Sequence, residues 1–225
     1  MNWKMVGRLI WKDWYLNRVA ILSALTGGLA MLGVVAALHG SLIPLILGTI
    51  VVVGILIGVG QVVMMSTVFE RKQQTLPFVM SLPISFREYT TAKVAGGLLI
   101  YLVLWTALVA GMVATILLAH GLPHGLIPFV LIMSVELLMS TCLVTAMSIT
   151  TESQGWTIAA TQAGVLSLNG LGWWFTSLPG IRGTLGGATV QWSSTATVLL
   201  TAELAAIALM IAITFLVQAR KRDFI

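Results

Sequence analysis

Six apolar runs, each about twenty residues or longer, constrain this chain more than any other feature of its sequence. They cover about residues 19–38, 43–67, 94–119, 126–150, 156–176 and 196–217. A helix needs about 20 mostly apolar residues to cross the hydrocarbon core of a bilayer. Backbone groups must be hydrogen-bonded inside that core, and the runs are too long for barrel strands. The sequence therefore predicts an all-α, polytopic membrane protein with six transmembrane helices.

The composition agrees with this fold class. Charged residues make up only 8% of the 225 residues, whereas a soluble domain has about 25%. The net charge of +5 does not indicate a nucleic-acid-binding protein, because the basic residues form no stripe on a soluble domain. They gather at the ends of the apolar runs, where they suit anionic lipid head groups. We expect one transmembrane domain over residues 1–225, in contact with membrane lipids and not with nucleic acid.

The distribution of Lys and Arg predicts the orientation. If the N-terminus is cytoplasmic, eleven of the twelve Lys and Arg residues fall on the cytoplasmic side and only Arg182 falls outside. Cytoplasmic connections carry the excess of Lys and Arg in membrane proteins. The sequence therefore predicts a multi-pass protein of the cell membrane with both termini in the cytoplasm.

Residues 1–18, ahead of the first run, predict an amphipathic helix lying at the membrane interface. Basic residues recur on one side of this helix, and apolar residues with Trp cover the other. Asp13 interrupts the apolar side, and the pattern offers no account of it beyond docking to a neighbouring span. A mechanical role as a lever is the alternative to a simple anchor. The predicted interface anchors are Trp3, Lys4, Arg8, Trp11, Lys12 and Trp14.

The connection between the second and third runs is the longest polar stretch, ERKQQTLPFVMSLPISFREYTTAK over residues 70–93. Pro77 and Pro83 bracket about two helical turns, since Pro is tolerated in a first turn but not in a helix interior. Two turns are unstable alone in water. This short helix must therefore lie on the membrane surface or enter a groove on a soluble partner.

The layout and this connection together resemble the permease subunits of type-2 ATP-binding-cassette exporters. The resemblance covers the whole chain in its six spans and N-terminal helix, and its specific part is the E-R-K…T…SLPIS…Y…AK pattern. It implies that residues 70–93 carry a coupling helix that seats on a separate ATPase subunit. The smaller loop at 150–155 would be a second contact. The residues implicated are Glu70, Arg71, Thr75, Leu76, Phe78, Val79, Leu82, Pro83 and Lys93, with Glu152 in the smaller loop.

The chain has no G-x-x-x-x-G-K-[ST] pattern, so we expect no ATP site of its own. The resemblance implies a non-catalytic subunit that binds no cofactor, with ATP and Mg on the partner. It also implies a homodimer, or a heterodimer with a related permease. The expected cargo is a hydrophobic or amphipathic compound such as a drug, antibiotic, peptide or lipid.

Residues 168–195 are rich in Gly and Trp, which predicts an irregular, membrane-pressed external connection between the fifth and sixth spans. In the family that the chain resembles, short re-entrant helices occupy this place.

Inside the spans, Glu136 and Glu203 are candidates for the translocation pathway or a dimer seam, because buried carboxylates are costly. Polar or small residues that share this expectation are Gln162, Asn169, Gly54 and Gly58. The structural alternatives are that Glu203 reaches the interface from the outer end of its helix, and that Gln162 and Asn169 donate hydrogen bonds between helices.

Two other function classes remain open at this level. An ion-coupled secondary transporter would work without an ATPase, and would show paired intramembrane charges, broken helices and an internal repeat. An intramembrane enzyme would need a nucleophile with a neighbouring base, and the sequence shows no such set.

Overall fold

The chain folds into a bundle of helices, which a computed structural model describes over residues 3–38, 42–72, 86–119 and 121–220. For 42, 45, 64–72, 86 and 87 the description covers the backbone alone. Within these ranges there are seven helices and no strand, which confirms the all-α prediction. The helices are α1 (Trp3–Ala37), α2 (Leu42–Lys72), α4 (Phe86–Leu118), α5 (Leu126–Thr151), α6 (Gln154–Ser177), α7 (Pro179–Leu185) and α8 (Ser194–Arg220).

Five of these helices, α1, α2, α4, α5 and α8, are long and apolar enough to cross a membrane. The 24-residue helix α6 has the length to cross, about 36 Å at 1.5 Å per residue, but it has no stretch as apolar as those of the other five. Five of the six predicted spans are therefore supported, and the sixth, α6, remains a prediction. The polar residues that lower its hydropathy include Gln154, Thr157, Thr161, Gln162, Ser167 and Asn169.

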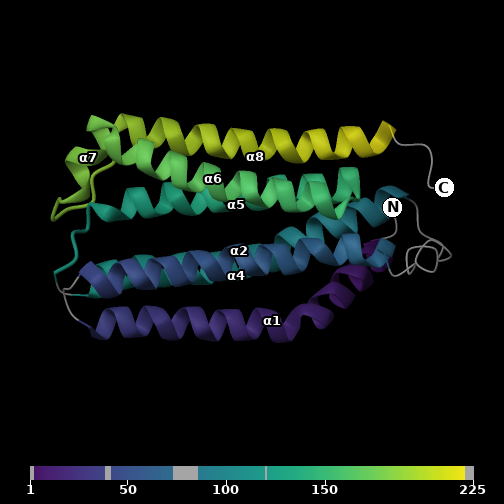
Figure 1. Ribbon diagram of the computed structural model, residues 1–225, viewed down its shortest axis with the longest axis horizontal. Helices are drawn as coiled ribbons and strands as arrows, with labels where there is room; N and C mark the ends of the chain where they lie inside the picture. Colours follow the sequence, from purple (N-terminus) through teal and green to yellow (C-terminus); the bar gives the residue numbers. More distant parts are fainter. Residues whose placement is uncertain (1–2, 39–41, 73–85, 120, 221–225) are drawn as a thin grey trace.

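The long helices run side by side along the long axis of the molecule (Figure 1). Helix α5 lies in the middle, with α2 and α4 on one side and α6 and α8 on the other, and α1 packs on the outside of α2 and α4. The start of α1, the end of α2, the start of α4, the α5–α6 turn and the end of α8 meet at one end. We call this the basic end, because it holds Lys4, Arg8, Lys12, Arg18, Lys93 and Arg220.

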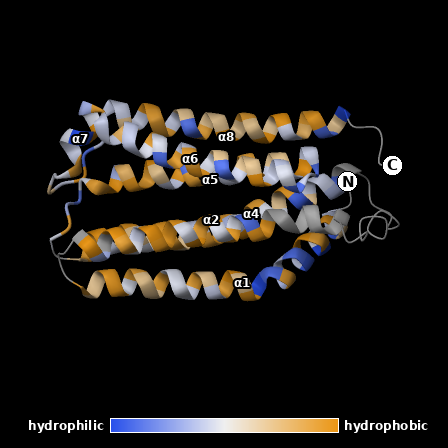
Figure 2. Cartoon of the chain, viewed as in Figure 1, coloured by the Kyte–Doolittle hydropathy of each residue, from blue (hydrophilic) through white to orange (hydrophobic). Residues whose placement is uncertain are grey.

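The bundle exposes many large apolar side chains, and hydrophobic residues predominate along most of its long helices (Figure 2). Large aliphatic side chains point outward from the flanking helices, such as Leu22 on α1, Ile50 on α2 and Leu204 on α8, which are 56%, 61% and 48% exposed. A continuous apolar surface of this kind is unfavourable in water. It supports the assignment of a multi-pass membrane protein.

Glycine residues let α1 and α4 approach closely. A Cβ on Gly111 would lie 2.8 Å from Leu32 Cδ1, and one on Gly96 would lie 3.3 Å from Ile10 Cγ1. Small residues at such contacts allow van der Waals packing between helices in lipid, where the hydrophobic effect contributes little. The contact with Ile10 shows that even the N-terminal part of α1 packs against protein.

The connection expected to be irregular over 168–195 is largely helical, which corrects the sequence-based prediction. Helix α6 continues to Ser177, and Pro179 then occupies the first turn of the short helix α7. Helix α7 packs against α5, α6 and α8 at the opposite end of the bundle, which we call the α7 end (Figure 1). Its Ile181 is buried with Phe175, Ile132 and Ala196. The several glycines of this segment are tolerated because tertiary packing overrides their weak helix propensity.

We expect Gly125→Ala to destabilise the α7 end, whereas Gly183→Ala should be neutral or slightly stabilising. A Cβ at Gly125 would overlap the backbone oxygen of Thr184, while nothing lies within 4 Å of one at Gly183. Overpacking of this kind costs about 1–3 kcal/mol. Thermal unfolding of the two purified variants checks this difference. If Gly125→Ala unfolds at the same temperature as the wild type, the α7 end repacks without cost around the added methyl group.

Candidate functional site

The N-terminal part of α1 is joined to the start of α4 at the basic end. It is not a separate helix, because α1 is continuous over 35 residues, about 52 Å at 1.5 Å per residue. This exceeds the hydrocarbon core of about 30 Å, so the helix extends beyond one boundary of the core. Figure 1 shows that its first turns run at an angle to the rest. Hydrophilic residues gather in this angled part (Figure 2).

The joint is a buried ion pair between Asp13 on α1 and Lys93 on α4. The Lys93 Nζ lies 2.9 Å from Asp13 Oδ2 and 3.2 Å from Oδ1. Lys93 is only 4% exposed and Asp13 only 6%. The Tyr89 ring centroid lies 6.0 Å from Lys93 Nζ, and Asn17 Nδ2 donates to the Asp13 backbone oxygen at 2.8 Å. The pair thus fixes the angled part of α1 to the first turns of α4.

The other predicted anchors lie outside this joint. Trp3 and Trp11 are 68% and 67% exposed, as interface anchors would be, and Trp14 packs against the main core cluster. Lys4 and Arg8 are exposed, and Lys12 is partly exposed, with its Nζ 3.8 Å from Asp13 Oδ1. The apolar side expected to face lipid is therefore largely covered by α4, since Val6 and Asp13 are both buried.

Most of the predicted ATPase contact lies outside the described residues. The backbone of α2 continues helically through Glu70 and Arg71 to Lys72, and α4 begins at Phe86. Both helix ends are at the basic end (Figure 1). The contact residues between these helices, Thr75, Leu76, Phe78, Val79, Leu82 and Pro83, belong to 73–85 and are not described.

Two residues of the predicted contact, Lys93 and Glu152, are described with their side chains. Lys93 is held inside the protein by Asp13, so in this conformation its amino group does not face a partner. Glu152 follows the last residue of α5 with φ 53°, and its N–H donates to Ser148 O at 3.1 Å. A non-glycine residue in the left-handed region is uncommon, and here it ends α5 and allows the sharp turn into α6.

Two buried carboxyl groups form a second constellation, between α5, α6 and α8. Glu136 on α5 is 0% exposed, and its Oε1 accepts a hydrogen bond from Ser167 Oγ on α6 at 2.6 Å. Glu203 on α8 is 6% exposed. Helices α5 and α8 pack together around Val135, Cys142 and Ile207. Glu136 follows Val135, and Glu203 lies about one turn from Ile207, so both carboxyl groups lie near this contact.

The four remaining candidates do not join these carboxyl groups. Gln162 and Asn169 are exposed on α6, and Asn169 Nδ2 donates to Val165 O of its own helix at 2.8 Å. Gly54 and Gly58 lie on α2, where a Cβ added to either glycine would have nothing within 4 Å. They therefore contribute to no packing seam among the described residues of the chain.

Polar side chains on several other helices form cross-links that sequence reasoning missed. Gln61 on α2 donates to the Thr161 hydroxyl on α6. Trp105 Nε1 on α4 donates to Ser134 O on α5 at 2.7 Å, and Gln218 Nε2 on α8 donates to Ile149 O at 2.5 Å. Such bonds between helices contribute about 0.6 kcal/mol each on average in lipid. Isolated polar residues within apolar runs were the available signal, but they do not name the partner.

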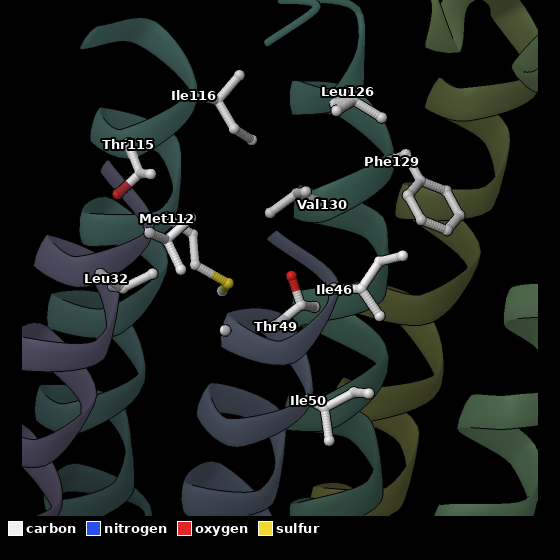
Figure 3. Close-up of a pocket in the computed structure, with 12 residues that line it drawn as sticks. Leu32, Ile46, Thr49, Ile50, Met112, Thr115, Ile116, Leu126, Phe129 and Val130 are labelled. Atoms are coloured by element: carbon white, nitrogen blue, oxygen red, sulfur yellow. The ribbon is translucent and has the colours of Figure 1, made fainter. Parts of the chain in front are cut away.

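Two cavities border the helices that carry these groups. One of about 290 Å³ lies toward the α7 end between α1, α2, α4 and α5. Figure 3 shows its apolar walls, including Leu32, Met112 and Phe129, with the hydroxyls of Thr49 and Thr115. A second cavity of about 230 Å³ lies between α5, α6 and α8, and Ser167 is part of its wall.

Comparison with known proteins does not assign the chain to a family. Among the described side chains, no group of three or more His, Cys, Asp or Glu residues is placed to hold a metal ion. No family model matches the sequence, and neither a curated protein nor a solved structure is significantly similar to it.

Proposed function

We propose that this chain is the membrane-spanning permease subunit of an ATP-driven exporter, powered by separate ATPase subunits. The family assignment rests on the sequence pattern in residues 70–93 and on the overall layout. The observation that carries the proposal in the structure is the buried Asp13–Lys93 pair. It connects α1 to α4, the helix that begins within residues 70–93.

The position of this pair suits a mechanical relay. The segment at 70–93 connects α2 to α4, and Lys93 lies two turns into α4. A force applied to the segment would act directly on α4, and through Asp13 on the angled part of α1. Close glycine contacts along α1 and α4 make these helices move as one unit. Rigid-body motion of packed helices is an established way to switch between two states.

Orientation and partners follow from the same proposal. The basic end is the cytoplasmic end, because Lys and Arg concentrate in cytoplasmic connections. A P-loop ATPase subunit there supplies ATP and Mg, and a second permease subunit, identical or related, completes the pathway. The apolar 290 Å³ cavity supports a hydrophobic or amphipathic cargo such as a drug, antibiotic, peptide or lipid.

Reconstitution tests this function directly. The tagged chain is purified from its native membranes, any P-loop ATPase that accompanies it is identified, and both are placed in proteoliposomes. We expect efflux of a fluorescent amphipathic probe that requires ATP, Mg and both proteins. Transport by the permease alone, without any ATPase, would contradict the proposal.

One observation favours a second candidate, an ion-coupled secondary transporter. Glu136 and Glu203 form the paired intramembrane carboxyl groups that such transporters use. The discriminating result is uptake or efflux by the isolated chain in proteoliposomes under an imposed ion gradient and without ATP.

A further inference from the structure

The carboxyl groups of Glu136 and Glu203 lack the partners that buried charges need. Glu136 Oε2 and both carboxyl oxygens of Glu203 are buried without a hydrogen-bond partner among the described residues. Only Glu136 Oε1 is satisfied, by the Ser167 hydroxyl. Buried polar atoms in folded proteins are almost always hydrogen-bonded. Three unsatisfied carboxyl oxygens in one region therefore indicate that a ligand completes the site.

The surroundings supply no positive charge to this pair. Helix α6 contains no ionisable residue, and Ser167 is the polar group that it contributes. Among the described side chains, none forms an ion pair with either carboxyl group, and Lys93 is already paired with Asp13. The other titratable or charged residues described on the helices that pack against α5 and α8 are Cys142, Tyr101, Tyr89, Glu88, Arg182 and Arg220.

Two ionised carboxylates cannot stay together in this setting. Burial disfavours the charged form of each group, and a like charge nearby disfavours it further. When a carboxylate has no counter-ion, it is neutralised by binding a proton. We propose that Glu136 and Glu203 form a proton-binding site, at which the pair holds at least one exchangeable proton inside the helix bundle.

A 230 Å³ cavity with apolar walls lies about one helical turn from the carboxyl pair. The backbones of α6 and α8 stay apart among the described residues, and α5 forms the floor of the cavity between them. The cavity wall includes Met139 and Ser140, about one turn from Glu136, and Ala206, about one turn from Glu203. Ser167 lies in the wall and also donates to Glu136. It therefore lies between the cavity and the carboxyl pair.

Loss of the proton would place two negative charges between α5 and α8. The repulsion would act on the apolar contact made by Val135, Cys142 and Ile207. The packing of α8 is thereby linked to the protonation state of the pair. This site is independent of the ATPase partner, so it would remain if the ATP-driven function were disproved.

Infrared spectroscopy of the full-length chain in lipid nanodiscs tests the proposal. The difference spectrum between wild type and the Glu136→Gln/Glu203→Gln double variant should show, at neutral pH, the C=O band of a protonated carboxylic acid that shifts in D₂O. Gln is nearly isosteric with protonated Glu, so the double variant should keep the fold. Glu152→Gln, at the basic end of α5, is the matched control and should keep the band. A difference spectrum with only ionised carboxylate bands overturns the proposal.

A chemical label gives a second readout on the unmodified protein. Dicyclohexylcarbodiimide reacts with protonated carboxylic acids in apolar surroundings: the acid adds across one C=N bond, and acyl transfer leaves an N-acylurea. Mass spectrometry should find this adduct on Glu136 or Glu203 at neutral pH and lose it as the pH rises. Absence of the adduct from both residues at neutral pH counts against the site even if the double variant fails to fold.

Discussion

Lys93→Met is expected to destabilise the protein by about 3–5 kcal/mol, because it leaves the Asp13 carboxylate buried without its partner. The Lys93 amino group lies 2.9 Å from Asp13 Oδ2. Lys12→Met is the matched control, since the partly exposed Lys12 Nζ lies 3.8 Å from the other oxygen of the same carboxylate. A surface pair contributes about 0–1 kcal/mol, so this variant should unfold near the wild-type temperature.

Replacing both partners distinguishes two effects on the free energy of unfolding: the destabilisation by an unpaired buried charge, and the net contribution of the ion pair. The double variant Asp13→Leu/Lys93→Met should recover most of the lost stability, since an apolar pair can replace a buried ion pair at little cost. Thermal unfolding of the four purified proteins in the same lipid or detergent measures this. Equal destabilisation by Lys12→Met and Lys93→Met would show that the pair is not buried in the folded protein.

Val79→Asp is expected to abolish ATPase binding and ATP-dependent transport while the helix bundle still folds. The residue is one of the apolar residues between Pro77 and Pro83, in the short segment that we propose to enter the ATPase subunit. A charge placed in a desolvated apolar contact without a partner prevents docking. The measurements are co-purification of the ATPase, ATP-driven efflux, and the melting temperature of the variant.

Val190→Asp is the matched control for this experiment. It makes the same change at a residue that is 42% exposed, in the connection between α7 and α8 at the α7 end. We expect this variant to keep the ATPase and to transport at the wild-type rate. Full activity in Val79→Asp would show that residues 70–93 do not couple the ATPase to transport. Loss of ATPase binding in Val190→Asp would show that the ATPase subunit binds at the α7 end and not at the basic end.

Sequence reasoning located the apolar helices because their signal is local. Each of the six runs falls within one helix to about one residue, since a hydrogen-bonded apolar helix is the stable form of such a run in lipid. The gathering of Lys and Arg at one end also follows from the order of the connections. The irregular character predicted for 168–195 was wrong over most of the segment, because packing around Ile181 and Phe175 stabilises helices despite their glycines.

Sequence reasoning singled out Glu136 and Glu203 but could not connect them. They are far apart in sequence, and their approach depends on α5 and α8 packing side by side. Ser167 gave no signal, because one hydroxyl in an apolar run can bond to its own helix. Asp13 stood out as a polar residue on an apolar side, and only its distance to Lys93 explains why it is there.

The sequence by itself determined that the helices are suited to lipid, that the chain is helical, and how charge is distributed between the two ends. Each of these follows from residues close together in the chain. Only the tertiary structure decided which polar groups are partners, Asp13 with Lys93 and Ser167 with Glu136, and that the helices carrying Glu136 and Glu203 pack together. The physical reason is that lipid provides no general hydrophobic force between helices. Helix pairing then depends on the shape of glycine contacts and on a few buried polar atoms, neither of which is encoded locally.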